Sequence, residues 1–176
     1  MDAERLIDQM KRDHARVLSE VFALESALGT GSGAPSSVIQ EVRRLLDLLH
    51  VQFQTHMLAE DQILFPALVR ALPASAGSVE PLQDEHAELR LMLERLRATL
   101  AEPPGGPRDE ETAVQVHDLA DLLRIHIRKE ESLVFGIAAR LLSGDVVEAV
   151  LTRMAAGGRP ERTPQPKPIQ TKGSLR

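Results

Sequence analysis

The chain has 176 residues, 43% of them apolar, which is enough for one domain with a buried core and a tail. Cys, Trp and Tyr are absent and Phe is rare, which excludes disulfides and thiolate metal sites and favours a helical core of Leu, Val and Ala. The formal net charge is −5 although residues 159–176 are basic, so the remaining chain is acidic and disfavours nucleic acid as a partner.

Segments rich in Gly, Pro and Ser divide the chain at residues 29–36, 73–78 and 102–107, with a weaker break at 143–144. Four long helical segments and a short fifth one are therefore expected. In the first, core-facing positions recur every three or four residues and include a histidine: Ile7, Met10, His14, Val17, Val21, Leu24 and Leu28. In the second, they include a histidine and a glutamate: Val42, Leu46, Leu49, Phe53, His56, Glu60, Ile63 and Ala67.

The third and fourth segments repeat this pattern. The third has core-facing Leu82, His86, Leu89, Leu93, Leu96 and Leu100, and the fourth has Leu119, Leu123, His126, Glu130, Leu133 and Ile137. Residues 145–155 predict a short amphipathic helix that could cover one end of the bundle. The sequence thus predicts an all-α, antiparallel up-down four-helix bundle over residues 1–156. A Pro-rich flexible linker is expected over 157–170, followed by a terminal peptide over 171–176.

The two halves of the bundle form an internal repeat. His56 and Glu60 match His126 and Glu130 at a separation of 70, and His14 matches His86 at a separation of 72. Duplication of a helical hairpin explains this regular spacing.

The repeated histidines and glutamates predict a metal site. His56 and Glu60 are four residues apart, so their side chains project from one face of a helix, about a turn apart. Burying imidazoles and carboxylates in an apolar core is unfavourable unless they are paired or bound to cations. Imidazole and carboxylate ligands without sulfur suit iron, manganese or zinc, and carboxylates that can bridge favour a two-metal site.

Other polar residues receive weaker predictions. The acidic neighbours of these ligands turn about 100° away on a helix, which predicts a supporting or surface role for Asp13, Asp61, Glu85 and Glu131. His50 and His117 have no partner in the repeat and are interpreted as surface residues.

These motifs resemble the bacterial hemerythrin-like, HHE cation-binding family. The matching elements are Asp13-His14, His56-x-x-x-Glu60-Asp61-x-x-Leu64-Phe65-Pro66, Glu85-His86 and His126-x-x-x-Glu130-Glu131. The resemblance implies a hemerythrin-like bundle that holds two iron ions joined by an oxide or hydroxide. It also implies that His14, His56, His86 and His126 are terminal ligands and that Glu60 and Glu130 are bridges. Zinc or manganese would accept the same ligands.

One position departs from the oxygen-carrying members of that family. These have a fifth histidine four residues from the one on the third helix, whereas Leu82 and Arg90 flank His86 at that distance. The remaining ligands leave two iron coordination positions open, which favours reaction with O2, peroxide or nitric oxide over simple O2 carriage. Whether the chain is a peroxide- or NO-consuming enzyme is left open.

The terminal peptide carries a second resemblance. Thr171, Gly173, Ser174, Leu175 and Arg176, which follow the Pro-rich linker, resemble the loading peptide by which cargo proteins dock inside encapsulin shells. In this reading Leu175 enters an apolar pocket of the shell protein, and Gly173 lets the backbones approach closely.

The first functional hypothesis is therefore an encapsulated di-iron protein that protects against oxidative or nitrosative stress. The alternatives are iron storage, iron handling or repair of damaged iron centres, and an oxygen or iron sensor. Repair members usually add a cysteine-bearing domain, and this sequence has no cysteine. No signal peptide or membrane span is recognisable, so the expected location is the bacterial cytoplasm, inside an encapsulin compartment; a homodimer is left open.

Overall fold

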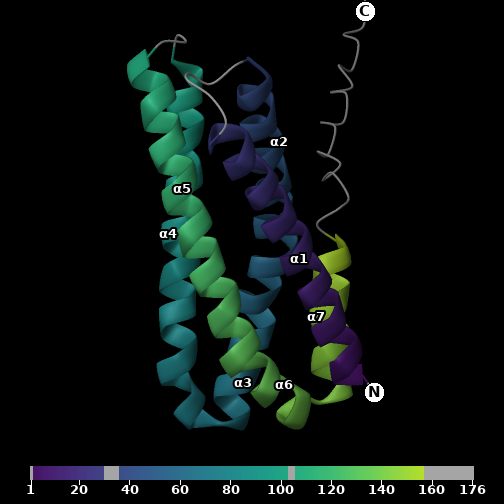
Figure 1. Ribbon diagram of the computed structural model, residues 1–176. Coiled ribbons are helices and arrows are strands. Elements are labelled where there is room, and N and C mark those ends of the chain that lie inside the picture. The colour runs from purple at the N-terminus through teal and green to yellow at the C-terminus, as the bar shows by residue number, and fades with distance from the viewer. Residues whose placement is uncertain (1, 30–35, 103–105, 157–176) are drawn as a thin grey trace, which may run out of the picture.

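The computed structural model describes residues 2–29, 36–102 and 106–156 (Figure 1). Every regular element in these ranges is helical and none is a strand. In chain order they are α1 (Asp2–Gly29), α2 (Ser36–Gln52), η1 (Phe53–Met57), η2 (Glu60–Leu64), α3 (Phe65–Ala71), η3 (Pro73–Ser75), α4 (Ala76–Ala101), α5 (Gly106–Lys129), η4 (Glu130–Val134), α6 (Phe135–Leu141) and α7 (Gly144–Ala156). The element η3 is a 3₁₀ turn, whereas η1, η2 and η4 are π-helical turns.

The helical segments predicted from the repeat are confirmed within these ranges. The second segment runs from α2 to α3 and the fourth from α5 to α6, each interrupted only by π-helical turns near the predicted ligands. The break predicted at residues 73–78 is shorter than expected because α4 already begins at Ala76, after a turn in which the Ser75 hydroxyl donates to the Leu72 carbonyl. The predicted linker and terminal peptide lie outside the described residues.

The long helices pack as a bundle. Helices α4 and α5 lie side by side, α1 packs against α2 and α5, and α2 contacts α4 (Figure 1). The short helix α7 lies against α1 and the π-helical turns η1 and η2, at the end of the bundle that also holds α3 and α6. Its inward side chains, Val147 and Val150, are buried there.

Two apolar clusters fill the interior. The larger cluster includes Val17, Leu49 and Leu123, and the smaller cluster includes Leu6, Leu64, Leu82 and Val134. Along each long segment the predicted polar ligands fall between residues of the two clusters. The core is therefore split by one polar layer, which the four segments reach at the same level.

The π-helical turns shift two predicted core positions. In η4 the amide of Phe135 donates to the carbonyl of Glu130, five residues earlier, so the turn holds one residue more than an α-helical turn. The core-facing side of the helix advances by one residue as a result: Val134 is 1% exposed, whereas the predicted Leu133 is 44% exposed. The equivalent turn η2 buries Leu64 fully and leaves Ile63 only half-buried.

None of the described helices is both long enough and apolar enough to cross a bilayer.

Candidate metal centre

The six predicted ligands converge in the polar layer between the two apolar clusters. All are buried, and they come from all four long segments: His14 from α1, His56 from η1, Glu60 from η2, His86 from α4, His126 from α5 and Glu130 from η4. Their ligand atoms form two overlapping groups of metal-binding geometry. One contains His14, His56, Glu60 and Glu130, and the other contains His86, His126 and Glu130.

Each glutamate faces one histidine of each group. Glu60 Oε1 lies 2.9 Å from His56 Nε2, and Glu60 Oε2 lies 3.5 Å from His86 Nε2. Glu130 Oε2 lies 3.1 Å from His14 Nε2 and 3.7 Å from His126 Nε2. Carboxylates that reach two sets of imidazoles are placed to bridge two cations.

The unpaired atoms at the centre fit a cation-binding role. Both carboxylate oxygens of Glu60, both of Glu130 and Nε2 of His56 are buried without a hydrogen-bond partner among the described residues. Native proteins rarely leave so many buried polar atoms unsatisfied, because each costs about 1–3 kcal/mol. Iron, manganese or zinc ions would take up these oxygen and nitrogen lone pairs directly.

Four acidic residues accept hydrogen bonds from the Nδ1 atoms of the four histidines, which point away from the centre. The Nδ1–H groups of His14 and His86 donate to Glu131 at 3.0 Å and to Asp61 at 2.7 Å. Those of His56 and His126 donate, in the same way, to Asp13 at 3.4 Å and to Glu85 at 3.1 Å. These contacts direct every Nε2 toward the centre and raise the basicity of the rings.

The acids form a closed ring around the bundle. Each is the sequence neighbour of one ligand, yet it bonds the histidine of the next segment: Asp13 of α1 reaches His56, Asp61 of η2 reaches His86, and the ring closes through Glu85 and Glu131. The supporting role predicted for these acids is therefore realised across helices. Sequence reasoning missed the pairing because spacing along one helix says nothing about its neighbour.

The ring is reinforced by cations on one side. Arg90 donates to Asp61 at 2.7 Å, and Lys129 pairs with Glu85, so both acids that hold His86 and His126 are clamped. Within the described part of the chain, the two acids that hold His14 and His56 contact no lysine or arginine. Arg90, four residues after His86, thus binds an acid that holds this histidine.

Two of the ligand histidines stack on phenylalanine rings. Phe65 stacks on His86 and Phe135 stacks on His14, both with centroid distances of 5.7 Å. Each phenylalanine directly follows a π-helical turn that begins at one of the two central glutamates. The widened turns therefore set the glutamate and the stacking ring together, in keeping with the frequent occurrence of π-bulges at functional sites.

The electrostatics of the site show that the two carboxylates cannot both ionise easily without cations. Burial and the charge of Glu130 raise the pKa of Glu60 to about 7. Burial also disfavours ionised Glu130, but the close approach of His14 and the charge of His126 outweigh this and lower its pKa. Burial lowers the pKa of His56, but the charge of Glu60 more than compensates and raises it well above its usual value.

Metal uptake should therefore release protons and strengthen as the pH rises through 7. Below the pKa of about 7 the Glu60 carboxyl must lose its proton before it binds, so apparent affinity should fall by about tenfold per pH unit from this group alone. The raised pKa of His56 adds to the dependence in the same direction. Calorimetric titration with zinc in buffers of different ionisation enthalpy measures the released protons; pH-independent affinity between pH 6 and 8 would contradict this prediction.

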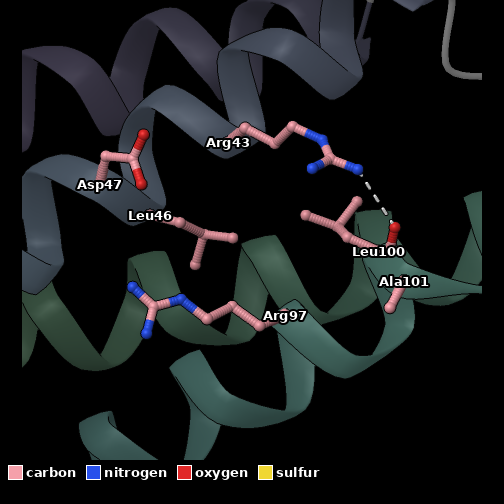
Figure 2. Close-up of a pocket in the computed structure, with 6 residues that line it drawn as sticks. All are labelled: Arg43, Leu46, Asp47, Arg97, Leu100 and Ala101. Carbon is pink, nitrogen blue, oxygen red and sulfur yellow. Dashed lines mark hydrogen bonds between the residues drawn. The ribbon is translucent and has the colours of Figure 1, made fainter.

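Other candidate features lie away from the centre. His50 and His117 are exposed, as predicted, and His117 lies 3.5 Å from Glu25. A groove of about 250 Å³ between α2 and α4 is flanked by Arg43 and Arg97, and its lining includes none of the six ligands (Figure 2). Arg43 donates there to the Leu100 carbonyl at 3.3 Å (Figure 2).

The bundle and its histidine–glutamate centre define a class of cation-binding helical protein. Residues 5–138 match the hemerythrin HHE cation binding domain, and the chain belongs to this family.

Two kinds of curated protein are similar to this chain in sequence. An iron-sulfur cluster repair protein, YtfE, of Escherichia coli O81 is 29% identical over 137 residues, covering 75% of this chain and 61% of that protein. A DNA nickase of Nostoc sp. is 28% identical over 117 residues, covering 66% of this chain and 31% of that protein. The chain thus spans less than two thirds of the length of either relative.

Proposed function

We propose that the centre holds two iron ions and that the chain handles iron for the repair of damaged iron centres. In this reading His14 and His56 bind one ion, His86 and His126 bind the other, and Glu60 and Glu130 bridge them. We also propose that the four long segments are arranged as the antiparallel up-down bundle that the repeat predicts. The iron pair, when bound, supplies redox chemistry and an exchangeable source of iron.

The observation that carries the proposal is the set of buried, unpaired carboxylate oxygens between two pairs of imidazoles. A purely structural polar layer would leave no such orphaned atoms. The similarity to a protein named for iron-sulfur cluster repair favours iron handling over the stress-protection hypothesis derived from the sequence. Because both relatives extend beyond the matched region, the proposal for this chain concerns only the metal centre that it contains.

Transfer of iron to a damaged cluster tests the proposal. An iron-sulfur enzyme whose cluster has been degraded by nitric oxide is incubated with the iron-loaded chain, and recovery of its cluster absorption is followed. Recovery should exceed that obtained with an equal concentration of free ferrous iron and should be absent with the metal-free chain. Equal recovery with free iron would overturn the proposed function.

A second candidate function is reaction of the iron pair with O2, peroxide or nitric oxide. A cavity of about 20 Å³ touches three of the four ligand histidines, His14, His56 and His126, and supports this candidate. Its volume is roughly that needed for one water-sized molecule. Its other walls are mainly apolar, including Val17, Leu49 and Leu123, which suits a diatomic gas.

Loading into an encapsulin shell remains a proposal from the sequence alone, because residues 171–176 lie outside the described structure. Co-expression with a shell protein should give co-purification of the full chain and none of a variant lacking Thr171 to Arg176. The deletion should leave iron content unchanged, because the deleted residues include none of the six ligands. Undiminished co-purification of the shortened chain would refute the docking role.

A further inference from the structure

The repeat that builds the metal centre is broken on one side of it. Gln52 and Thr55 of the first half correspond, at a separation of 70, to Leu122 and Ile125 of the second half. The π-helical turn η1 has no counterpart either, because residues 123–127 belong to α5. A symmetric metal pair does not require the two halves to differ at these positions. We therefore interpret the difference as a function that only the first half has.

The polar side of the repeat faces a surface cleft. A cleft of about 390 Å³ lies between α1, the end of α2 and α7, and its walls include Gln52, Thr55 and Met154. Helix α7 has contacts with α1, which carries His14, and with η1, which carries His56. The cleft therefore opens beside one of the two proposed metal positions.

The cleft and the inner cavity share two wall residues. Asp13 and Gln52 line the cleft, and the same two residues line the 20 Å³ cavity that touches His14, His56 and His126. Gln52 is 8% exposed and so is nearly buried between the two spaces. A change of its rotamer would therefore alter the barrier between the cleft and the cavity.

The side of the centre that holds His86 and His126 carries ion pairs. Lys129 lies over Glu85 beside His126, whereas the matching position in the first half is the small, buried Ala59. Arg90 fixes Asp61 beside His86 in a similar way. Entry on that side would require ion pairs to break, but entry past Gln52 requires only a rotamer change.

We propose that a small uncharged molecule of diatomic or peroxide size reaches the centre through the cleft under α7, with Gln52 as the gate. The proposal rests on the second candidate function, in which the iron pair reacts with such a molecule. Asp13 is a positioning residue that holds His56 at the inner end of this path. The apolar lining beyond Gln52 favours O2, nitric oxide or hydrogen peroxide over anions and larger substrates.

The association rate of nitric oxide with the di-ferrous protein tests the path. Gln52→Phe, which fills the gate, should lower the rate constant about tenfold, and Gln52→Ala should raise it several-fold. Met154→Trp, at the half-buried mouth, should also lower it. Thr152→Trp on the exposed face of the same helix is the matched control and should leave the rate unchanged.

Two further readouts separate the path from the iron chemistry. Iron content and the final nitrosyl spectrum should be the same in all four variants, because none changes a ligand. Krypton under pressure in crystals of the metal-free protein should occupy the cavity beside Val17 and Leu49.

The outcomes are distinguishable. Equal association rates in the wild type, both Gln52 variants and Met154→Trp, or an empty cavity under krypton, would overturn the path while leaving the metal site intact. A wild-type protein that binds iron but not nitric oxide would overturn the second candidate function, and the path with it.

Discussion

Glu60→Gln should remove the dinuclear site while leaving the bundle folded. Glutamine has the shape of glutamate but no charge, and its amide cannot bridge two cations as a carboxylate does. Because Glu60 faces one histidine of each group, both proposed metal positions lose a ligand. Iron bound per chain should fall from about two to one or none, with an affinity loss of at least about 100-fold.

Metal analysis after gel filtration measures this loss, and circular dichroism checks the fold. Glu88→Gln, on the exposed face of α4 two residues from His86, is the matched control and should retain full iron content. Unchanged iron content in Glu60→Gln would contradict the bridging role.

Removal of the metal should lower the stability of the wild-type protein substantially. A ligand present at about 1,000 times its dissociation constant stabilises the folded state by about 4 kcal/mol. For a domain of this size such a change corresponds to a fall in unfolding temperature of about 10 °C. Without metal, the buried carboxylates of Glu60 and Glu130 have no partner for their oxygens, so the metal-free bundle has a weakened middle.

Differential scanning calorimetry before and after chelation measures the shift, and zinc or ferrous iron should restore the higher unfolding temperature. The Glu60→Gln variant provides a control in which chelation should have little effect. A wild-type unfolding temperature that is independent of metal would show that the polar layer is stable without cations.

The helical segments and the six-residue centre were predictable because they depend on periodic patterns. An apolar residue every three or four positions identifies the buried face of each helix, and His14 or Glu130 within that face must lie inside. The repeat then places the four histidines at one level. The metal-binding use of these residues remains a prediction, supported by the family match.

The π-helical turns were not predictable in the same way. Whether Leu133 or Val134 is buried depends on a one-residue change in the hydrogen-bond pattern after Glu130, and both residues are apolar. Composition therefore gives no signal that distinguishes the two positions. The contacts of Arg90 and Lys129 also escaped prediction, because the partner of a long charged side chain depends on which helix packs beside it.

The closed ring of acids has a consequence for how the protein acquires its cations. Each ring member sits next to one ligand and supports the ligand of the following helix, so turning a single helix about its axis displaces its own ligand and frees a neighbour's imidazole. Half-assembled centres are disfavoured by this arrangement, and capture of the two ions should be cooperative. For the proposed pair of ions, little of the singly loaded species is therefore expected at equilibrium.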